Sequence, residues 1–312
     1  MSEPLGARVR PRRLRAGDRV AVVAPSGPVD RKRLEAGREV LASLGLDVVL
    51  AEHATDLSGF LAGDDRDRAA DLQRAWCHPE VRAVICARGG YGAGRVLPHL
   101  DWQAMSAAGP TLLHGSSDAT ALHSAVAARL GVVTTFGPMV ANSLLGRDDP
   151  DFTSMAHLRD TLFAPERVQT VHAKDGRAAV RGRARGPVTG GTLSLLAAAV
   201  GTPYRPPPAR GCIALLEDVD EAPYRVDRML TQLLQSGWLE GVAGVALGSW
   251  IDCGDAEEVE AVLSERLGPL GVPVLSGLPV GHGIPQLTVP LGVEAELDAD
   301  AGTLVFIEPA LA

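Results

Sequence analysis

The segment TLLHGSSDATALHSAVAARL, residues 111–130, combines a short apolar strand, a tight turn and a helix. Residues 111–114 predict a buried strand, and residues 118–130 predict a helix. The turn GSSD at residues 115–118 therefore places Ser117 between a strand and a helix, near the positive end of the helix dipole. This arrangement is typical of an α/β sheet with a functional side chain at the carboxyl end of a strand.

The same alternation of strand and helix fills the rest of the amino-terminal half. Further strands are predicted at residues 19–24, 47–50, 81–87 and 132–135, and helices at residues 31–44 and 69–76. Apolar strands that alternate with helices imply a parallel sheet with helices on both faces. Ligands of such sheets bind at the carboxyl ends of the strands, where the loops 25–27, 88–92 and 115–118 are expected.

The second half of the chain has a different pattern. Residues 147–186 are charged and irregular, so we expect a domain boundary there and divide the chain into residues 1–165 and 166–312. Helices are predicted at residues 191–200, 226–238 and 256–267, and short strands broken by prolines at residues 272–307. The predicted fold is α/β, with an amino-terminal parallel-sheet sandwich domain and a smaller carboxy-terminal α+β, barrel-like domain.

Composition narrows the class of protein. Of the 312 residues, 46% are hydrophobic and 22% charged, which is typical of a soluble globular protein. The net charge of −8 argues against nucleic acid as the main partner. The apolar run at residues 20–24 is shorter than the ~7–15 residues of an export signal. No stretch approaches the ~20 apolar residues of a membrane span, so we expect a cytoplasmic protein without a membrane partner.

Neither a metal nor a cofactor is expected from the motifs. The four cysteines, Cys77, Cys86, Cys212 and Cys253, lie far apart without a C-x-x-C spacing, so no zinc site or disulfide framework is indicated. The glycine-rich loop RGGYG at residues 88–92 lacks the G-x-G-x-x-G spacing and the Lys-Ser/Thr pair of phosphate-binding loops.

Ser117 needs a base and an orienting acid to become a nucleophile. The candidates are Glu217, which follows the predicted strand 212–216, and His282, in a Gly-His-Gly loop. Glu221 competes with Glu217 for the role of the acid. The alternative for Ser117 is a helix cap, because serine is favoured at that position.

The glycine-rich loop offers a second component of such a site. The backbone amides of Gly90 and Asp118 could stabilise a tetrahedral oxyanion. The alternative is a plain turn that uses glycine for its backbone conformation. Arg88 could bind a substrate carboxylate through two parallel hydrogen bonds, or it could form an interdomain ion pair.

Seven segments, taken together and in order, are similar to those of one enzyme family. They are APSG (24–27), RGGYG (88–92), GSSD (115–118), FGPM (136–139), GGTLSL (190–195), LEDVDEAPYR (216–225) and GLPVGH (277–282). The chain resembles the LD-carboxypeptidases, or muramoyl-tetrapeptide carboxypeptidases, from about residue 14 to residue 291. The resemblance implies an active site between the two domains and makes a homodimer plausible.

The resemblance also assigns roles to residues. It implies that Ser117 is the nucleophile and that Glu217 and His282 complete the triad. The chain departs from the family at Ser116, where an aromatic residue is usual, and at Thr192, where asparagine is usual. We expect Arg88, Tyr91, Ser116 and Thr192 to contact the substrate.

The expected function is a serine carboxypeptidase that hydrolyses the L,D amide bond to a terminal D-amino acid in peptidoglycan-derived tetrapeptides, in cell-wall recycling. Its expected partner is a small peptide or muropeptide. One alternative is a microcin-immunity-type peptidase that cleaves acyl- or peptidyl-nucleotide amides, which the departure at Ser116 keeps open. An alternative of another class is a non-catalytic, two-domain peptide-binding protein.

Overall fold

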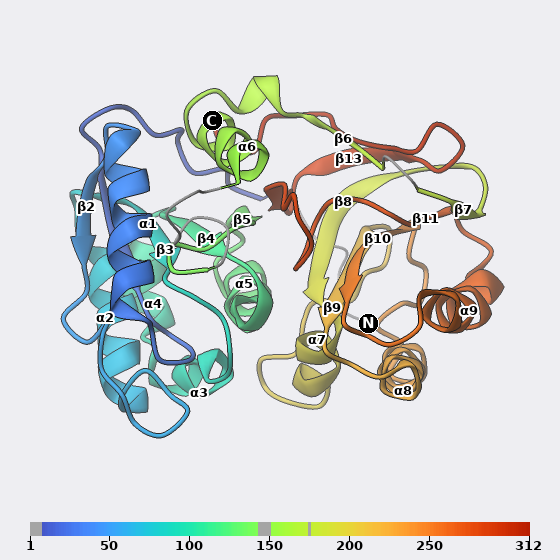
Figure 1. Ribbon diagram of the computed structural model, residues 1–312, viewed down its shortest axis with the longest axis horizontal. Coiled ribbons are helices and arrows are strands. Elements are labelled where there is room, and N and C mark those ends of the chain that lie inside the picture. The colour runs from blue at the N-terminus through green and yellow to red at the C-terminus, as the bar shows by residue number, and fades with distance from the viewer. Residues whose placement is uncertain (1–7, 143–150, 174–175) are drawn as a thin grey trace.

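The computed structural model describes residues 8–142, 151–173 and 176–312, and it contains two sheets with helices packed on them. The amino-terminal sheet and its helices form one lobe, drawn mostly in blue and green in Figure 1, and the carboxy-terminal sheet forms the other. Strands and helices alternate in the first lobe, and the α/β fold class is confirmed. Residues 147–150, at the start of the expected boundary segment, lie outside the described residues.

The first sheet has six strands in the order β12-β5-β4-β3-β1-β2. They are β1 (Arg19–Val23), β2 (Asp47–Leu50), β3 (Val81–Cys86), β4 (Leu112–Gly115), β5 (Thr134–Phe136) and β12 (Val289–Leu291). β1 to β5 are parallel, and β12 pairs antiparallel with β5 at the edge. The far end of the chain therefore completes the amino-terminal sheet, which the sequence pattern did not indicate.

Helices cover both faces of this sheet. They are α1 (Arg31–Ser43), α2 (Asp65–Cys77), α3 (Ala93–Val96), α4 (Trp102–Ala108), α5 (Thr120–Arg129) and α6 (Phe152–Phe163). On one face, α2, α4 and α5 contribute Leu72, Met105 and Leu122 to a buried core. On the other face, α1 and α6 contribute Leu41 and Leu158. Each such side chain contributes about 1.5–3 kcal/mol when fully buried, so the two cores hold the sheet from both sides.

The second sheet has eight strands in the order β6-β14-β13-β8-β9-β10-β11-β7. They are β6 (Thr170–His172), β7 (Ala178–Val180), β8 (Arg183–Thr192), β9 (Ile213–Val219), β10 (Gly244–Ile251), β11 (Val274–Leu275), β13 (Glu294–Asp298) and β14 (Thr303–Phe306). The central strands β8 to β11 are parallel, and the outer strands are antiparallel to their neighbours. Three helices, α7 (Leu193–Ala199), α8 (Pro223–Gln235) and α9 (Ala256–Leu267), pack on one face.

A shared apolar core joins the two lobes. Phe136 of β5 and Val289 of β12 are buried in the same cluster as Val188 of β8, Leu215 of β9 and Val280. The face of the second sheet that lacks α7, α8 and α9 therefore packs against the edge of the first sheet, in the centre of Figure 1. This packing sets where the carboxyl ends of β4 and β9 lie relative to each other.

The structure corrects three local expectations. Residues 152–163 form α6 although their sequence is irregular, because Asp151 caps the helix and Leu158 and Leu162 are buried. Residues 191–192 end β8 and do not begin a helix, since Thr192 pairs with a residue of β9. The predicted helix at 118–130 begins as a separate 3-10 turn, η2 (Ser117–Ala119).

The 3-10 helices of the described residues are η1 (Leu97–His99), η2, η3 (Pro165–Arg167) and η4 (Gly268–Leu270).

Two expectations from composition can be compared with the fold. Across the described residues, we find no helix whose length and apolar character would let it cross a membrane. Cys86 and Cys212 are buried free thiols, as predicted from their place in apolar strands. Burial raises the pKa of Cys86 to about 12, so this thiol stays protonated and acts as a small apolar group.

Candidate active site

Ser117 lies just beyond the carboxyl end of β4, as the first residue of η2. Its φ of 57° is in the left-handed region, which costs a serine about 1–3 kcal/mol. Among the described residues, its hydroxyl has no hydrogen-bond partner, so the side chain does not act as a helix cap. The turn therefore leaves a half-buried hydroxyl free to act as a nucleophile if a base reaches it.

The glycine-rich loop lies directly against this turn. A Cβ added to Gly89 would come within 2.9 Å of Ser117 Oγ, so the loop approaches the hydroxyl closely. The Ala93 amide donates to Asp118 Oδ2 at 2.7 Å, which ties the end of the loop to the turn. The amides of Gly90 and Asp118 donate no hydrogen bond to other residues in the described part of the chain. The two predicted oxyanion donors therefore have no acceptor among the described residues, and they directly follow Gly89 and Ser117, which approach each other closely.

Glu217 and His282 form a hydrogen-bonded pair in the second lobe. His282 Nδ1 lies 2.7 Å from Glu217 Oε2. Glu217 is completely buried, whereas the His282 side chain is 22% exposed. A carboxylate only accepts hydrogen bonds, so Nδ1 carries the proton and Nε2 of the neutral ring is left as an acceptor. The rival acid Glu221 instead lies 3.5 Å from Arg225.

Glycine at position 281 allows the histidine loop to approach Glu217. Gly281 has a φ of 111°, and an added Cβ would lie 2.4 Å from Glu217 Oε2. Ser249, near the end of β10, holds this loop: its amide donates to the Val280 carbonyl at 2.8 Å, and its hydroxyl accepts from the Gly283 amide at 2.9 Å. Sequence reasoning missed Ser249, although the carboxyl end of a strand is where functional groups of parallel sheets gather.

A series of hydrogen bonds connects this pair to the turn that carries the serine. Thr120 begins α5 directly after η2, and its hydroxyl accepts from the Thr192 amide at 3.1 Å. The Thr192 hydroxyl in turn donates to Glu217 Oε1 at 2.5 Å. A second connection runs from Gln286 Nε2 to Ser116 Oγ at 3.2 Å. The three predicted catalytic residues thus belong to one connected region between the lobes, and sequence reasoning missed Thr120 and Gln286 in it.

The neighbouring acidic groups raise the pKa of His282. Burial alone would lower its pKa, but the hydrogen bond and charge of Glu217, with the charge of Asp218, outweigh burial, and the pKa is raised above the ordinary 6.5. Burial raises the pKa of Asp218 to about 6, against hydrogen bonds from Val219 and Ser194. The acidic pair therefore stabilises an imidazolium at position 282. His282 and Ser117, both in the described part of the chain, form no hydrogen bond with each other.

Two of the predicted substrate contacts lie on the glycine-rich loop. Arg88 donates to the carbonyls of Pro28 at 3.0 Å and Gly89 at 3.1 Å, and it has no carboxylate partner among the described residues. The interdomain ion pair considered for Arg88 is therefore absent from the described residues, and its guanidinium joins two loops of the first lobe. Tyr91 is 54% exposed, with its ring centroid 5.7 Å from that of Phe60, so this aromatic pair faces solvent beside the loop.

The other two predicted substrate contacts are almost fully buried. Ser116 is 3% exposed, and its hydroxyl accepts a hydrogen bond from Gln286. Thr192 is 2% exposed, and its hydroxyl is used by Glu217. The register of β8 on β9 places Thr192 opposite Glu217, and its contact with the substrate stays a prediction.

Two other histidines near the turn serve the fold. His114 lies between Thr135 Oγ1 and the Pro138 carbonyl, at 3.0 and 2.8 Å. His123 reaches back along its helix to the Gly115 carbonyl at 3.0 Å, as helical side chains lean toward the amino terminus. Burial lowers the pKa of both rings to about 4, so they are neutral and fix the strand ends around Ser117.

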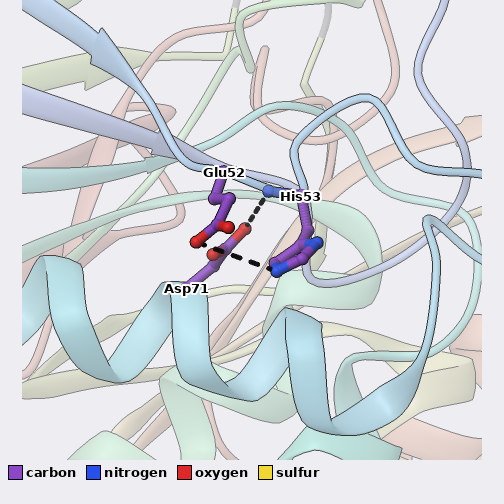
Figure 2. Close-up of side chains that lie close together, drawn as sticks. All are labelled: Glu52, His53 and Asp71. Carbon is purple, nitrogen blue, oxygen red and sulfur yellow. Dashed lines mark hydrogen bonds and ion pairs between the residues drawn. The ribbon is translucent and has the colours of Figure 1, made fainter.

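A separate cluster of metal-ligand residue types lies after β2. Figure 2 shows Glu52, His53 and Asp71, whose ligand atoms lie within 4.8 Å of one another. Arg74 already pairs with Asp71 at 2.5 Å and with Glu52 at 3.0 Å. The hydrogen bond to Asp56 raises the pKa of His53, which favours its protonated form. The Arg74 cation thus already pairs with both carboxylates, and a metal ion would have to displace it.

The fold and the site define a two-domain α/β protein with an acid–histidine pair next to a serine turn. The LD-carboxypeptidase N-terminal domain family matches residues 20–137, and the LD-carboxypeptidase C-terminal domain family matches residues 185–297. Together these matches cover more than half of the chain. The protein therefore belongs to the LD-carboxypeptidase family of peptidases, as its sequence motifs indicated.

Similar proteins extend over nearly the whole chain. A Streptomyces coelicolor protein, whose carboxypeptidase name is provisional, is 56% identical over 310 residues and covers 97% of both chains. The murein tetrapeptide carboxypeptidase of Pseudomonas aeruginosa is 34% identical over 291 residues, 90% of this chain and 94% of that protein. The microcin C7 self-immunity protein, solved with aspartyl sulfamoyl adenosine, has a TM-score of 0.88 at 24% identity, over 97% of this chain and 100% of that one. At 24% identity, this last comparison shows a shared fold.

Proposed function

We propose that this protein is a serine carboxypeptidase that removes the terminal D-amino acid from peptidoglycan-derived tetrapeptides by cleaving the L,D amide bond. The observation that carries the proposal is the 2.7 Å hydrogen bond between His282 and the buried Glu217, in the region that also contains the strained Ser117 turn. These are the groups that nucleophilic catalysis by serine requires: a hydroxyl, a base and an acid that orients the base.

In the first step, Ser117 Oγ attacks the carbonyl carbon of the scissile amide. His282 Nε2 takes the hydroxyl proton, while Glu217 holds the Nδ1 proton and stabilises the imidazolium that forms. Hydrogen bonds of a catalytic site are often long before substrate binds, so the contact between Ser117 and His282 is expected to close in the complex. The raised pKa of His282 supports this proton transfer.

In the second step, the tetrahedral intermediate collapses. The amides of Gly90 and Asp118 donate to its oxyanion, and His282 gives the proton to the leaving amine as the carbon–nitrogen bond breaks. Water then attacks the acyl-enzyme, with His282 as base, and the shortened peptide leaves as a carboxylate. In each step the nucleophile, the base and the oxyanion donors are residues of this chain.

Relatives support the choice of substrate. The Pseudomonas aeruginosa relative is named a murein tetrapeptide carboxypeptidase, and it covers nine-tenths of this chain. The competing substrate class, an acyl-nucleotide amide, comes from the fold likeness to the microcin C7 self-immunity protein. A small peptide is the proposed partner, in cell-wall recycling, and a cytoplasmic location and a homodimer remain predictions.

The substrate class can be tested by direct comparison. We expect the protein to release D-alanine from a muropeptide tetrapeptide, at an unchanged rate when a chelator is present. The matched control is the same tetrapeptide ending in L-alanine, which should be hydrolysed far more slowly because the reacting carbonyl would be misplaced. Aspartate release from an aspartyl-nucleotide amide, without D-alanine release, would overturn the proposed substrate and favour the competing class.

The pH dependence of hydrolysis follows from His282. A general base must be neutral, and the pKa of His282 is raised above 6.5, so activity should fall as the pH drops through that raised value. We expect the acid limb of kcat/KM to have its midpoint above about 6.5, measured from about pH 5 to about pH 9 at constant ionic strength. Circular dichroism at each pH controls for unfolding. A midpoint below that of an ordinary histidine would contradict the assignment of His282 as base.

A further inference from the structure

The Thr192 hydroxyl donates a hydrogen bond to the carboxylate oxygen of Glu217 that does not contact His282. Thr192 and Glu217 are directly paired residues of the parallel strands β8 and β9, so their side chains can share one face of the sheet. The Thr192 hydroxyl donates to Oε1 at 2.5 Å, and His282 contacts Oε2 at 2.7 Å. A completely buried carboxylate is costly unless such donors surround it, so the two contacts together determine its orientation.

The backbone of Thr192 is held by the other lobe. The preceding glycines allow a close approach: an added Cβ would lie 2.1 Å from the Leu215 carbonyl oxygen at Gly190, and 2.7 Å from Thr120 Oγ1 at Gly191. Because the two segments lie so close together, the Thr192 amide can donate to Thr120 Oγ1, at 3.1 Å. Thr120 begins the helix that follows the Ser117 turn. Thr192 is therefore fixed between the serine turn and the triad acid.

We propose that Thr192 is a positioning residue that orients Glu217, and through it His282, and that it couples this pair to the serine turn of the other lobe. The inference rests on the proposed serine mechanism. Without the threonine hydroxyl, the Glu217 carboxylate can rotate and its buried Oε1 loses a donor. The imidazole then spends less time in the orientation that accepts the Ser117 proton.

The kinetic test compares Thr192→Val, which keeps the shape and removes the hydroxyl, with Thr192→Ser, which restores it. Loss of a hydrogen bond to a buried charge should lower kcat about 10- to 100-fold. KM should stay within about threefold because the Thr192 side chain is only 2% exposed and its hydroxyl is bonded to Glu217. Thr192→Ser should recover most of kcat. The matched control is Thr189→Val, on the same strand but paired with Ala214, and it should leave kcat unchanged.

A second measurement does not depend on the substrate. The Nδ1 proton of His282, hydrogen-bonded to Glu217, should give a strongly downfield proton NMR resonance in the wild type and in Thr192→Ser. In Thr192→Val this resonance should broaden or move. If the wild type hydrolyses no tetrapeptide, the proposed function fails, but this resonance still decides the role of Thr192.

The outcomes separate clearly. A Thr192→Val protein with wild-type kcat and an unchanged resonance would overturn the positioning role. A fall in kcat that Thr192→Ser does not rescue would also overturn it, because the hydroxyl would not be the cause. If Thr192→Val fails to fold, Thr192→Ala removes the same hydroxyl without the added branched carbon, and the comparison with Thr192→Ser is repeated with it.

Discussion

Replacing Ser117 by alanine should reduce kcat for D-alanine release by ~10⁴-fold or more while the protein stays folded. The hydroxyl is the proposed nucleophile, and neither Glu217 nor His282 can replace the covalent step. The hydroxyl has no hydrogen-bond partner among the described residues, so its removal should change the melting temperature little. Peptide binding should survive, because the oxyanion amides and the glycine-rich loop are unchanged.

The control for this variant is Ser124→Ala, which removes another serine hydroxyl from α5, the helix that follows the turn. Its kcat should equal that of the wild type. Steady-state D-alanine release gives kcat, and calorimetric titration with the tetrapeptide gives the affinity. Equal hydrolysis by Ser117→Ala and wild type would show that Ser117 is not the nucleophile. Tight peptide binding without hydrolysis by either protein would favour the non-catalytic peptide-binding alternative.

Replacing Glu217 by glutamine should lower kcat by about 10⁴-fold, as expected when the base is held in the wrong tautomer. The geometry gives the reason. The Thr192 hydroxyl donates to the Oε1 position, so the glutamine oxygen should take that place. The amide nitrogen then faces His282 Nδ1 and donates to it. The ring proton moves to Nε2, where the acceptor for the Ser117 proton is needed.

The same variant should change the titration of His282. Without the Glu217 charge, burial is opposed only by Asp218, so the pKa of His282 should fall from its raised value. A pH titration of the imidazole by NMR measures this. The control is Glu221→Gln, whose carboxylate pairs with Arg225 and does not contact His282. An unchanged pKa in Glu217→Gln, or a kcat close to that of the wild type, would contradict the assignment of Glu217 as the orienting acid.

Much of the first lobe could be predicted because its signals are local. The strand at 47–50 has the predicted bounds, and so does the helix at 256–267 in the second lobe. Apolar periodicity within one element is enough to predict the secondary structure of that element. The turn at Ser117 could also be predicted, because it is defined by a strand, a short linker and a helix that are adjacent in the sequence. The helix α6 was missed because two of its four buried residues, Ser154 and Thr161, are polar, so only Leu158 and Leu162 mark its buried face as apolar.

The candidate site was predicted less completely. Ser117, Glu217 and His282 could be named from sequence motifs, and the structure brings Glu217 and His282 into contact. Thr120 and Ser249 were missed, because a threonine at a helix start and a serine in a strand carry no signal of their own. The role of Thr192 depends on strand register, which is only weakly specified in a glycine-rich segment such as the end of β8.

The sequence by itself determined the five parallel strands of the first sheet, the position of the serine turn and the family motifs. Tertiary structure decided which acid contacts the histidine, which side chains connect the lobes, and that β12 completes the first sheet. The reason is distance along the chain: Glu217 and His282 are 65 residues apart, and Thr120 and Thr192 are 72 apart. Hydrogen bonds between such residues need placement within a few tenths of an ångström, and only the shared packing of the two sheets provides it.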